Sequence, residues 1–301
     1  MDGERWRCGG LSWGRGVPEL RWVRGTGTRA SRLAHAQEIA FRAAGVRRCA
    51  GVRGQVCPLG AVVPGRSTGG QCPECARLDR AHSVAADTVA GDPRPFRVYL
   101  AWFGPGLVKV GITAEERGTA RLLEQGAVVF CWLGRGPLMA ARRTEELLRA
   151  ALGVPDRISY ARKRAVRPVL PAAAEERAAE VVGLYARAVE LPGWPEALER
   201  AAFEVVDHVR VFGLDRAVPP GPARGGPSAL RVVRELVDGG CVAGRLVAAA
   251  GPDLHLGGQD GRMTVLDTRL LSGWELVAAD PRPAPTVPVD ELPTGVQDGL
   301  F

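Results

Sequence analysis

Two short apolar runs surround a turn rich in glycine and proline near the middle of the chain. Residues 98–101 read Val-Tyr-Leu-Ala, residues 103–106 read Phe-Gly-Pro-Gly, and residues 108–113 read Val-Lys-Val-Gly-Ile-Thr. Apolar runs of this length on both sides of such a turn are typical of a β-hairpin. The pattern therefore predicts two antiparallel strands in this part of the chain.

After the hairpin, the hydrophobic spacing becomes that of helices and one further strand. It predicts a helix over about residues 114–125, a strand over 127–133 and a helix over about 138–152. Together with the hairpin, these elements make residues 96–170 an α+β domain in which a small antiparallel sheet is flanked by helices.

The rest of the chain has weaker patterns. Leu11-Ser12-Trp13 and residues 20–23 predict two strands, residues 37–43 predict a strand or a short helix, and residues 77–90 predict a short helix. The predicted order is an N-terminal β-rich segment (1–48), a four-cysteine segment (49–95), the α+β domain (96–170), a helical segment (171–215), a linker (216–228), a small β-module (229–279) and a disordered tail (280–301).

Charge divides the chain into a basic first half and an acidic C-terminal part. Residues 1–75 contain 12 basic and 5 acidic residues, and residues 96–170 contain 13 and 6, whereas residues 171–301 contain 12 and 19. A basic half suggests a polyanion such as nucleic acid as partner, although scattered solvated arginines give the same count. Only two of the 40 basic residues are lysines, Lys109 and Lys163, and Lys109 is retained within an apolar strand.

The chain shows no membrane or secretion signal. No apolar run is long enough to span a bilayer, and residues 1–5 lack the apolar core of a secretory signal. We therefore expect a cytoplasmic protein that makes no membrane contact. In a reducing compartment, cysteines are interpreted as metal ligands or buried thiols before disulfides.

Four of the seven cysteines lie between residues 49 and 75. Cys72-Pro-Glu-Cys75 is a Cys-x-x-Cys knuckle, and Cys49 and Cys57 lie upstream of it in a glycine-rich stretch. Four thiolates in tetrahedral arrangement suit a structural zinc ion. The segment is therefore predicted to be zinc-ribbon-like, with Cys49, Cys57, Cys72 and Cys75 as the Zn²⁺ ligands.

The cysteines also allow other interpretations. A Cys-x-x-Cys pair can act in redox chemistry, usually at a helix N-terminus, and a helix is predicted after Cys75. His82 could replace one ligand, but a lone histidine on a charged helix is more often solvated. The remaining three cysteines, Cys8, Cys131 and Cys241, are interpreted as buried thiols.

The hairpin and the helices after it carry chemical groups in a particular order. Tyr99 lies on the first strand, Lys-Val-Gly at 109–111 on the second, Arg121 on the first helix and a glutamate pair at 145–146 on the next. This order resembles that of the GIY-YIG nuclease superfamily, in which a three-stranded antiparallel sheet is flanked by helices.

The resemblance implies divalent-metal-dependent cleavage of nucleic acid. Tyr99 or Lys109 would position or deprotonate the attacking water, Arg121 would stabilise charge on the phosphate, and Glu145 would hold Mg²⁺ or Mn²⁺. A desolvated Lys109 near arginines would have a lowered pKa and act as a base or as a phosphate contact.

Other residues of this segment are assigned to nucleic-acid contact or kept as alternates. Gly111 would permit close approach of the substrate, and Thr113 and Arg117 would lie near it. Arg117 is also the alternate for the helical arginine, and Glu146 is the alternate metal ligand. In a purely structural alternative, the tyrosine packs in a core, Lys109 extends its ammonium to solvent, and the two glutamates lie on the helix surface beside Arg142, Arg143 and Arg149.

The whole layout also resembles an uncharacterised bacterial family known only as a domain of unknown function. The matching pieces are the N-terminal segment, the four cysteines, the Tyr99 strand, residues 109–113, residues 121–127 and Asp156-Arg157. This second resemblance implies no activity.

The last five residues read Gln-Asp-Gly-Leu-Phe. They resemble the Gln-x-x-Leu-Phe peptide by which bacterial DNA-metabolism proteins dock on the sliding clamp. Gln297 would then meet a polar rim, and Leu300 and Phe301 would enter an apolar pocket. The alternative is an ordinary frayed chain end.

One function is preferred from these observations, and two others stay open. The preferred function is metal-dependent phosphodiester hydrolysis on nucleic acid, with DNA as the favoured substrate, in DNA repair or related DNA metabolism. The alternatives are a non-catalytic, zinc-containing nucleic-acid-binding module and an adaptor that docks on the sliding clamp.

Overall fold

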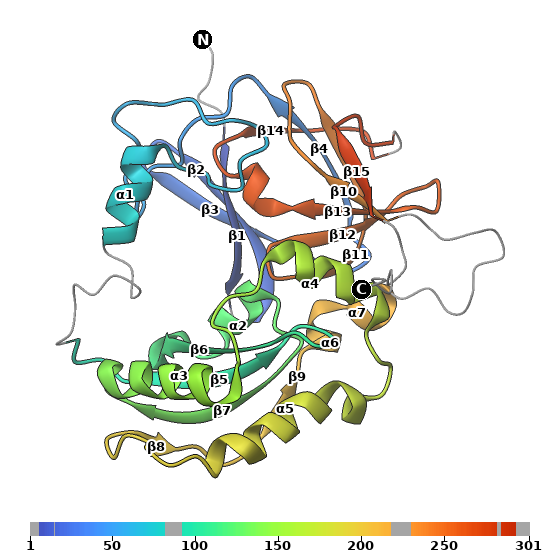
Figure 1. The fold of residues 1–301 in the computed structure, drawn as a ribbon. Helices are drawn as coiled ribbons and strands as arrows, with labels where there is room; N and C mark the ends of the chain where they lie inside the picture. Colours follow the sequence, from blue (N-terminus) through green and yellow to red (C-terminus); the bar gives the residue numbers. More distant parts are fainter. Residues whose placement is uncertain (1–5, 15, 82–91, 218–229, 282–283, 293–301) are drawn as a thin grey trace, which may run out of the picture. The chain divides into compact units, whose positions relative to one another are not determined.

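The computed structural model describes residues 6–14, 16–81, 92–217, 230–281 and 284–292, and Figure 1 labels its elements. The chain divides into two compact units. Unit 1 contains residues 1–86 and 216–301, and unit 2 contains residues 87–215. Each unit has its own β-sheet, so the chain is an α+β protein, as predicted, with most of its regular structure in strands.

Unit 2 is built on an antiparallel sheet of five strands. These strands are β5 (Phe96–Trp102), β6 (Val108–Ala114), β7 (Val129–Gly136), β8 (Glu199–Arg200) and β9 (Val205–Asp207). Their order is β6-β5-β7-β8, and β9 also pairs with β7. The predicted hairpin is confirmed as β5 and β6, with Tyr99 opposite Gly111 and Ala101 opposite Lys109. Because alternate residues of a strand share a face, these four residues lie on one face of the sheet.

Helices complete unit 2 and position its functional groups. They are α2 (Ala120–Gln125), α3 (Leu138–Leu152), α4 (Tyr160–Val166), α5 (Ala174–Val189), α6 (Val209–Phe212) and the first half of α7 (Leu214–Ala217), whose last two residues belong to unit 1. The predicted helix over residues 138–152 is confirmed as α3, which packs against β5, β6 and β7 (Figure 1). Gly126 and Gly153, both in the left-handed conformation, end α2 and α3.

Three parts of unit 2 differ from the predicted elements. The helix predicted from residue 114 begins only at Ala120, because residues 115–117 form a 3-10 turn that ends at Gly118 with a φ of 48°. Helix α4 is not among the predicted elements; the Ser159 hydroxyl caps it by accepting a hydrogen bond from the Arg162 amide. The segment 171–215 is helical over α5, but it also contributes the short strands β8 and β9.

Unit 1 contains a ten-stranded sheet. Its strands are β1 (Arg7–Gly14), β2 (Val17–Arg24), β3 (Gly27–Arg32), β4 (Glu38–Ala44), β10 (Leu230–Val233), β11 (Cys241–Ala250), β12 (Asp253–Gly257), β13 (Met263–Asp267), β14 (Glu275–Ala278) and β15 (Val289–Leu292). Their order is β15-β10-β13-β12-β11-β4-β14-β1-β2-β3. The pair β10–β13 is parallel, and the other pairs are antiparallel. Unit 1 also contains helix α1 (Pro73–Ala81) and the 3-10 turn η4 (Thr268–Leu271).

Strand pairing joins the two ends of the chain in unit 1. The predicted strands near the N-terminus are confirmed as β1 and β2, and residues 37–43 belong to a strand, β4. Strand β4 pairs with β11 and β14, so the N-terminal segment and the predicted β-module share one sheet. Part of the predicted disordered tail is ordered, because β15 pairs with β10 along its whole length. Most of the predicted linker lies outside the described residues.

A buried arginine links the loops of unit 1. Arg47 is 1% exposed, and its guanidinium donates hydrogen bonds to the carbonyl oxygens of Pro64, Ser67, Arg269 and Ser272 over 2.6–3.0 Å. Burial lowers the pKa of Arg47 to about 10. This side chain therefore fastens the cysteine-bearing part of the chain to the turn at η4.

We find no helix in the described ranges that is both long and apolar enough to cross a membrane.

Candidate functional site

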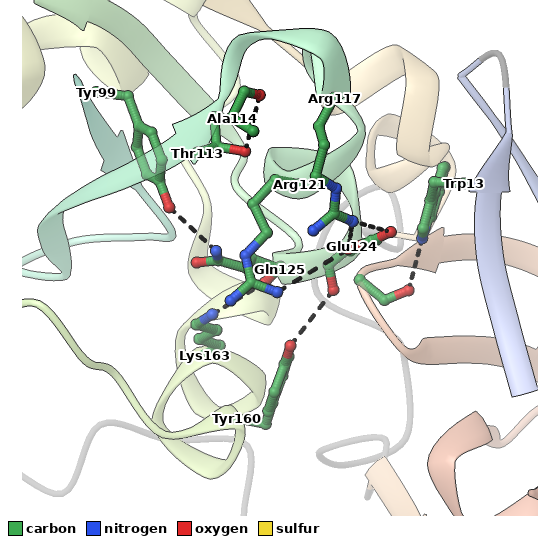
Figure 2. A network of polar contacts seen from close by, with 11 residues as sticks. Trp13, Tyr99, Thr113, Ala114, Arg117, Arg121, Glu124, Gln125, Tyr160 and Lys163 are labelled. Carbon is green, nitrogen blue, oxygen red and sulfur yellow. Dashed lines mark hydrogen bonds and ion pairs between the residues drawn. The ribbon is translucent and has the colours of Figure 1, made fainter. Parts of the chain in front are cut away.

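Tyr99 lies at the centre of one face of the sheet in unit 2 and is 1% exposed. Its ring belongs to an apolar cluster that includes Phe103, Leu122 and Phe130. Its hydroxyl accepts a hydrogen bond of 3.0 Å from the side-chain amide of Gln125, which comes from the end of α2 (Figure 2). Burial raises the pKa of Tyr99, so the phenol keeps its proton at neutral pH.

Gly111 makes room for that phenol. It is paired with Tyr99 across β5 and β6, and a Cβ atom at Gly111 would lie 2.4 Å from the Tyr99 hydroxyl oxygen and 2.5 Å from its Cζ. No side chain fits at this distance without moving the tyrosine ring. In this structure, the group that closely approaches Gly111 is therefore the phenol of Tyr99.

Lys109 is buried beside Tyr99 rather than extended into solvent. It is 8% exposed, and its Nζ donates a hydrogen bond of 2.9 Å to the main-chain carbonyl of Asp156 and lies 5.7 Å from the centroid of the Tyr99 ring. Burial lowers the pKa of Lys109 to about 8, and the positive charge of Arg121 acts in the same direction. The carboxylates of Glu145 and Asp156 oppose this lowering of the Lys109 pKa.

The two helical arginines differ in how strongly they are engaged. Arg117 makes two close hydrogen bonds, of 2.7 and 2.8 Å, to the carboxylate of Glu124. Arg121 is only 4.0 Å from the same carboxylate and is partly exposed. Arg121 and Gln125 are four residues apart, so they share one face of α2. Of the two arginines, Arg121 therefore has the less occupied guanidinium (Figure 2).

The neighbouring glutamates of α3 have different surroundings. Glu146 is exposed and forms an ion pair of 2.8 Å with Arg149, one turn later. Glu145 is half-buried; burial raises its pKa, the charge of Asp156 raises it further, and Lys109 lowers it. Glu145 is thus the glutamate whose charge acts on Lys109.

We call Tyr99, Lys109, Arg121, Gln125 and Glu145 the Tyr99 site. They come from β5, β6, α2 and α3, and each is linked to another member by a hydrogen bond or by its effect on that member's pKa. The structure thus brings together the four residues predicted as catalytic.

Thr113 is the remaining residue predicted to contact nucleic acid, and Gln125 of the Tyr99 site and Asp156 near it are two residues that were not predicted as functional. Thr113 is buried, and its hydroxyl lies 3.5 Å from the carbonyl of Ala114. Of these two, Asp156 is matched only as part of Asp156-Arg157 in the resemblance to the family of unknown function. The only sequence signal for Gln125 is its four-residue spacing from Arg121.

Both lysines of the chain are buried against main-chain carbonyls in unit 2. Lys163 donates a hydrogen bond of 2.9 Å to the carbonyl of Gln125, and its ammonium lies 3.8 Å from the centroid of the Phe103 ring. Tyr160, also on α4, donates to the carbonyl of Glu124 at 3.3 Å. Helix α4 therefore holds the C-terminal end of α2, which carries Gln125 (Figure 2). A compact ammonium suits such a site better than a planar guanidinium.

The four predicted cysteine ligands lie together in unit 1. Cys49, Cys57, Cys72 and Cys75 are all buried, and their Sγ atoms lie within 4.8 Å of one another. The sulfurs of Cys57 and Cys72 are 3.9 Å apart, close to the ~3.8 Å expected between ligands of a tetrahedral ion with bonds of about 2.3 Å. All four are free cysteines. This cysteine cluster can therefore hold a metal ion such as zinc.

Local backbone geometry supports the cysteine cluster. The amides of Gly51 and Cys72 donate to the Cys49 sulfur at 3.4 and 3.1 Å. Gly51 has a φ of 76°, and a Cβ there would lie 1.8 Å from the Gln55 carbonyl oxygen, so this turn requires glycine. Backbone amides lower the pKa of Cys57 to about 6, whereas burial raises the pKa of Cys49 and of Cys75.

Several predicted residues lie outside this cluster or outside the described residues. Cys8 and Cys131 are buried thiols, as predicted, and Cys241 is partly exposed. His82 is not among the described residues, and neither are the residues of the clamp-binding peptide, Gln297, Leu300 and Phe301. Docking on the sliding clamp therefore stays a prediction.

Fold and site together define an α+β protein with a buried four-cysteine cluster in one unit and a charged tyrosine-lysine site in the other. The model of the family described as "Protein of unknown function (DUF2797)" matches residues 36–276, which is more than half of the chain. The chain belongs to this family. Searches of curated proteins and of solved structures gave no match. The family description names no activity, so the GIY-YIG resemblance stays a prediction.

Proposed function

We propose that this protein binds nucleic acid and hydrolyses its phosphodiester bonds at the Tyr99 site, with a GIY-YIG-like arrangement and Mg²⁺ or Mn²⁺. The observation that carries the proposal is the convergence of a tyrosine, a lysine, an arginine and a carboxylate from four separate elements. Hydrolysis of a phosphodiester needs a base, a group that neutralises phosphate charge, and support for the leaving oxygen. DNA is the favoured substrate, within DNA metabolism.

Lys109 is the preferred base of the site. With a pKa of about 8, a useful fraction of its amine is neutral near physiological pH and can accept a proton from water. The raised pKa of Tyr99 makes a phenolate base unfavourable. Its hydroxyl accepts from Gln125, which leaves the phenol proton to donate to the attacking water or to a phosphate oxygen.

Arg121 and Glu145 complete the proposed chemistry. The weakly engaged guanidinium of Arg121 would bind the phosphate in two-pronged fashion. Glu145, with Asp156 close enough to raise its pKa, would hold the divalent ion, since carboxylates together with phosphate oxygens are the usual ligands of Mg²⁺. When bound, such an ion supplies charge neutralisation at the leaving oxygen.

The cysteine cluster is proposed to hold structural zinc. Four buried thiols at this spacing form a closed ligand set with no position for substrate, which is the arrangement of structural rather than catalytic zinc. A redox dithiol needs only two cysteines, so it leaves the other pair unexplained.

The test is a cleavage assay on the zinc-loaded full chain. Branched, single-stranded and duplex DNA and RNA are incubated with Mg²⁺, with Mn²⁺ or with neither, using wild type, Arg121→Gln and Arg143→Gln. Arg143 is an exposed arginine of α3 and controls for loss of one positive charge. We expect cleavage only with the divalent ion and about 100-fold slower in Arg121→Gln alone. Equal rates in the two variants, or no cleavage of any substrate, would count against the proposal.

A second candidate is a non-catalytic nucleic-acid-binding protein with structural zinc. The deep burial of Tyr99 and Lys109 favours it, because a reacting phosphate must come within hydrogen-bond distance of both. This candidate predicts binding that weakens steeply with salt, without cleavage under any metal condition.

A further inference from the structure

Four side chains of unit 1 form an alternating stack of arginine and tryptophan. We call Trp6, Trp22, Arg24 and Arg29 the arginine–tryptophan ladder. The guanidinium carbon of Arg24 lies 4.7 Å from the centroid of the Trp6 ring, and that of Arg29 lies 4.4 Å from Trp6 and 5.6 Å from Trp22. Trp22 and Arg29 face each other directly across β2 and β3. The ladder therefore joins the start of β1 to the two outermost strands of the sheet.

Among the described residues, few carboxylates accompany the arginines of the ladder. Residues 17–32 include four arginines and a single acidic residue, Glu19. Glu19 is engaged by Arg32 at 3.1 Å. Within the described residues, no carboxylate lies at ion-pair distance from Arg24 or Arg29. Their N–H groups thus remain available to an anionic ligand.

The ladder is also accessible and partly rigid. Strand β3 ends the sheet, and all six of its residues are exposed. The indole N–H of Trp22 donates a hydrogen bond of 3.0 Å to the Ser31 hydroxyl, which fixes the ring on the outer strands. Arginines on an edge strand also discourage pairing between molecules, but that role does not require stacked tryptophans.

We propose that the arginine–tryptophan ladder binds single-stranded nucleic acid. Arg24 and Arg29 contact the phosphates, and the indole of Trp22, at the end of the stack, stacks on an unpaired base, whereas Trp6 holds the two guanidiniums. Stacking holds each guanidinium plane in place, so less side-chain entropy is lost when it binds a phosphate. Only unpaired bases present their faces to an indole, which favours a single strand over a duplex. This binding does not depend on catalysis at the Tyr99 site.

The experiment measures fluorescence anisotropy with the full chain and no added Mg²⁺ or Mn²⁺. The probes are a labelled thymidine 12-mer, an abasic 12-mer of equal charge and a 12-bp duplex. The variants are Trp22→Ala, Trp22→Phe and Arg29→Gln. Arg80→Gln, at an exposed arginine of α1 in the same unit, is the matched control. Circular dichroism verifies that each variant is folded.

We expect Trp22→Ala to bind the thymidine 12-mer about ten-fold more weakly, with the abasic 12-mer unaffected and with Trp22→Phe restoring most of the binding. Arg29→Gln should lower the slope of log K against log salt by about 0.7, and Arg80→Gln should leave it unchanged. The proposal would be overturned by any of three results. These are equal affinity for the thymidine and abasic 12-mers, equal effects of Arg29→Gln and Arg80→Gln, or tighter binding of an acidic peptide of the same charge. If the separate cleavage assay finds no cleavage while this assay finds the expected binding, only the proposed hydrolysis is contradicted.

Discussion

Replacing Lys109 by methionine should stabilise the protein at pH 7 while removing the proposed base. Methionine has a similar length and no charge, so it fits the same buried position. The pKa of Lys109 falls from 10.5 to about 8 in the folded protein, and each pH unit corresponds to about 1.4 kcal/mol. Holding the proton on this buried amine at pH 7 therefore costs the folded state about 3 kcal/mol.

The variant also loses the hydrogen bond to the Asp156 carbonyl, worth about 1–2 kcal/mol. The expected net gain in the free energy of unfolding is about 1–2 kcal/mol at pH 7. Below pH 8 both folded and unfolded chains keep the proton, so the cost is constant there. Between pH 8 and 10.5 the unfolded chain binds more protons than the folded one, so wild-type stability rises with pH. The advantage of the variant should thus fall by about 2 kcal/mol between pH 7 and pH 9.5.

The assay is urea unfolding of wild type, Lys109→Met and Arg143→Met at both pH values, with a reductant present. Taking the difference between variant and wild type cancels the titration of groups whose pKa does not depend on Lys109. Arg143 is exposed on the same unit, so its variant should show no pH-dependent difference. The reasoning would be refuted if the difference in free energy of unfolding between Lys109→Met and wild type were equal at the two pH values. It would also be refuted if the variant were less stable than wild type at pH 7, because the buried ammonium of Lys109 would then not destabilise the folded state.

Three further predictions concern positions that the fold fixes. Arg47→Met should lower the free energy of unfolding, measured in urea, by about 3 kcal/mol or more, because four carbonyls lose their donor. The control Arg48→Met removes one exposed contact to a carbonyl and should lower it by less than about 1 kcal/mol; equal losses would contradict the linking role of Arg47. Gly111→Ala should displace Tyr99 and cost about 1–3 kcal/mol, whereas Gly183→Ala, in open space on α5, should be neutral or stabilising; the reverse order would be inconsistent with the structure. Metal analysis should find one zinc per chain in wild type and weaker retention in Cys57→Ser during chelator titration, while hydrogen exchange in β5–β7 stays unchanged; a metal-free wild type would exclude the zinc assignment.

The elements with strong local signals were predictable from the sequence. Strands β5 and β6 are apolar runs around a Gly/Pro turn, and α3 has a regular apolar face that ends at Gly153. Strand β3 has no buried position, so it lacks the alternation of apolar and polar residues that would predict a strand. The joining of β4 to β11 depends on residues about 200 positions apart, a distance over which periodicity carries no information.

The candidate site was predictable only for side chains with distinctive chemistry. Tyr99, Lys109 and the four cysteines are unusual residues in recognisable patterns. Asp156 contributes a main-chain carbonyl, which no side-chain motif encodes. The choice of Glu145 over Glu146 depends on the phase of α3, because adjacent helical residues point about 100° apart. Which of the two glutamates faces the sheet is set by how α3 packs against it, and the two adjacent glutamates alone do not reveal this.

The most direct measurement is the single-turnover cleavage rate of Glu145→Gln beside Glu146→Gln, titrated with Mn²⁺ on the substrate that wild type cuts best. Both variants remove one negative charge from adjacent positions of α3, but only Glu145 acts on Lys109. Metal-dependent hydrolysis at the Tyr99 site predicts a loss of about 100-fold or more for Glu145→Gln, and less than about two-fold for Glu146→Gln. Equal rates in the two variants would contradict it.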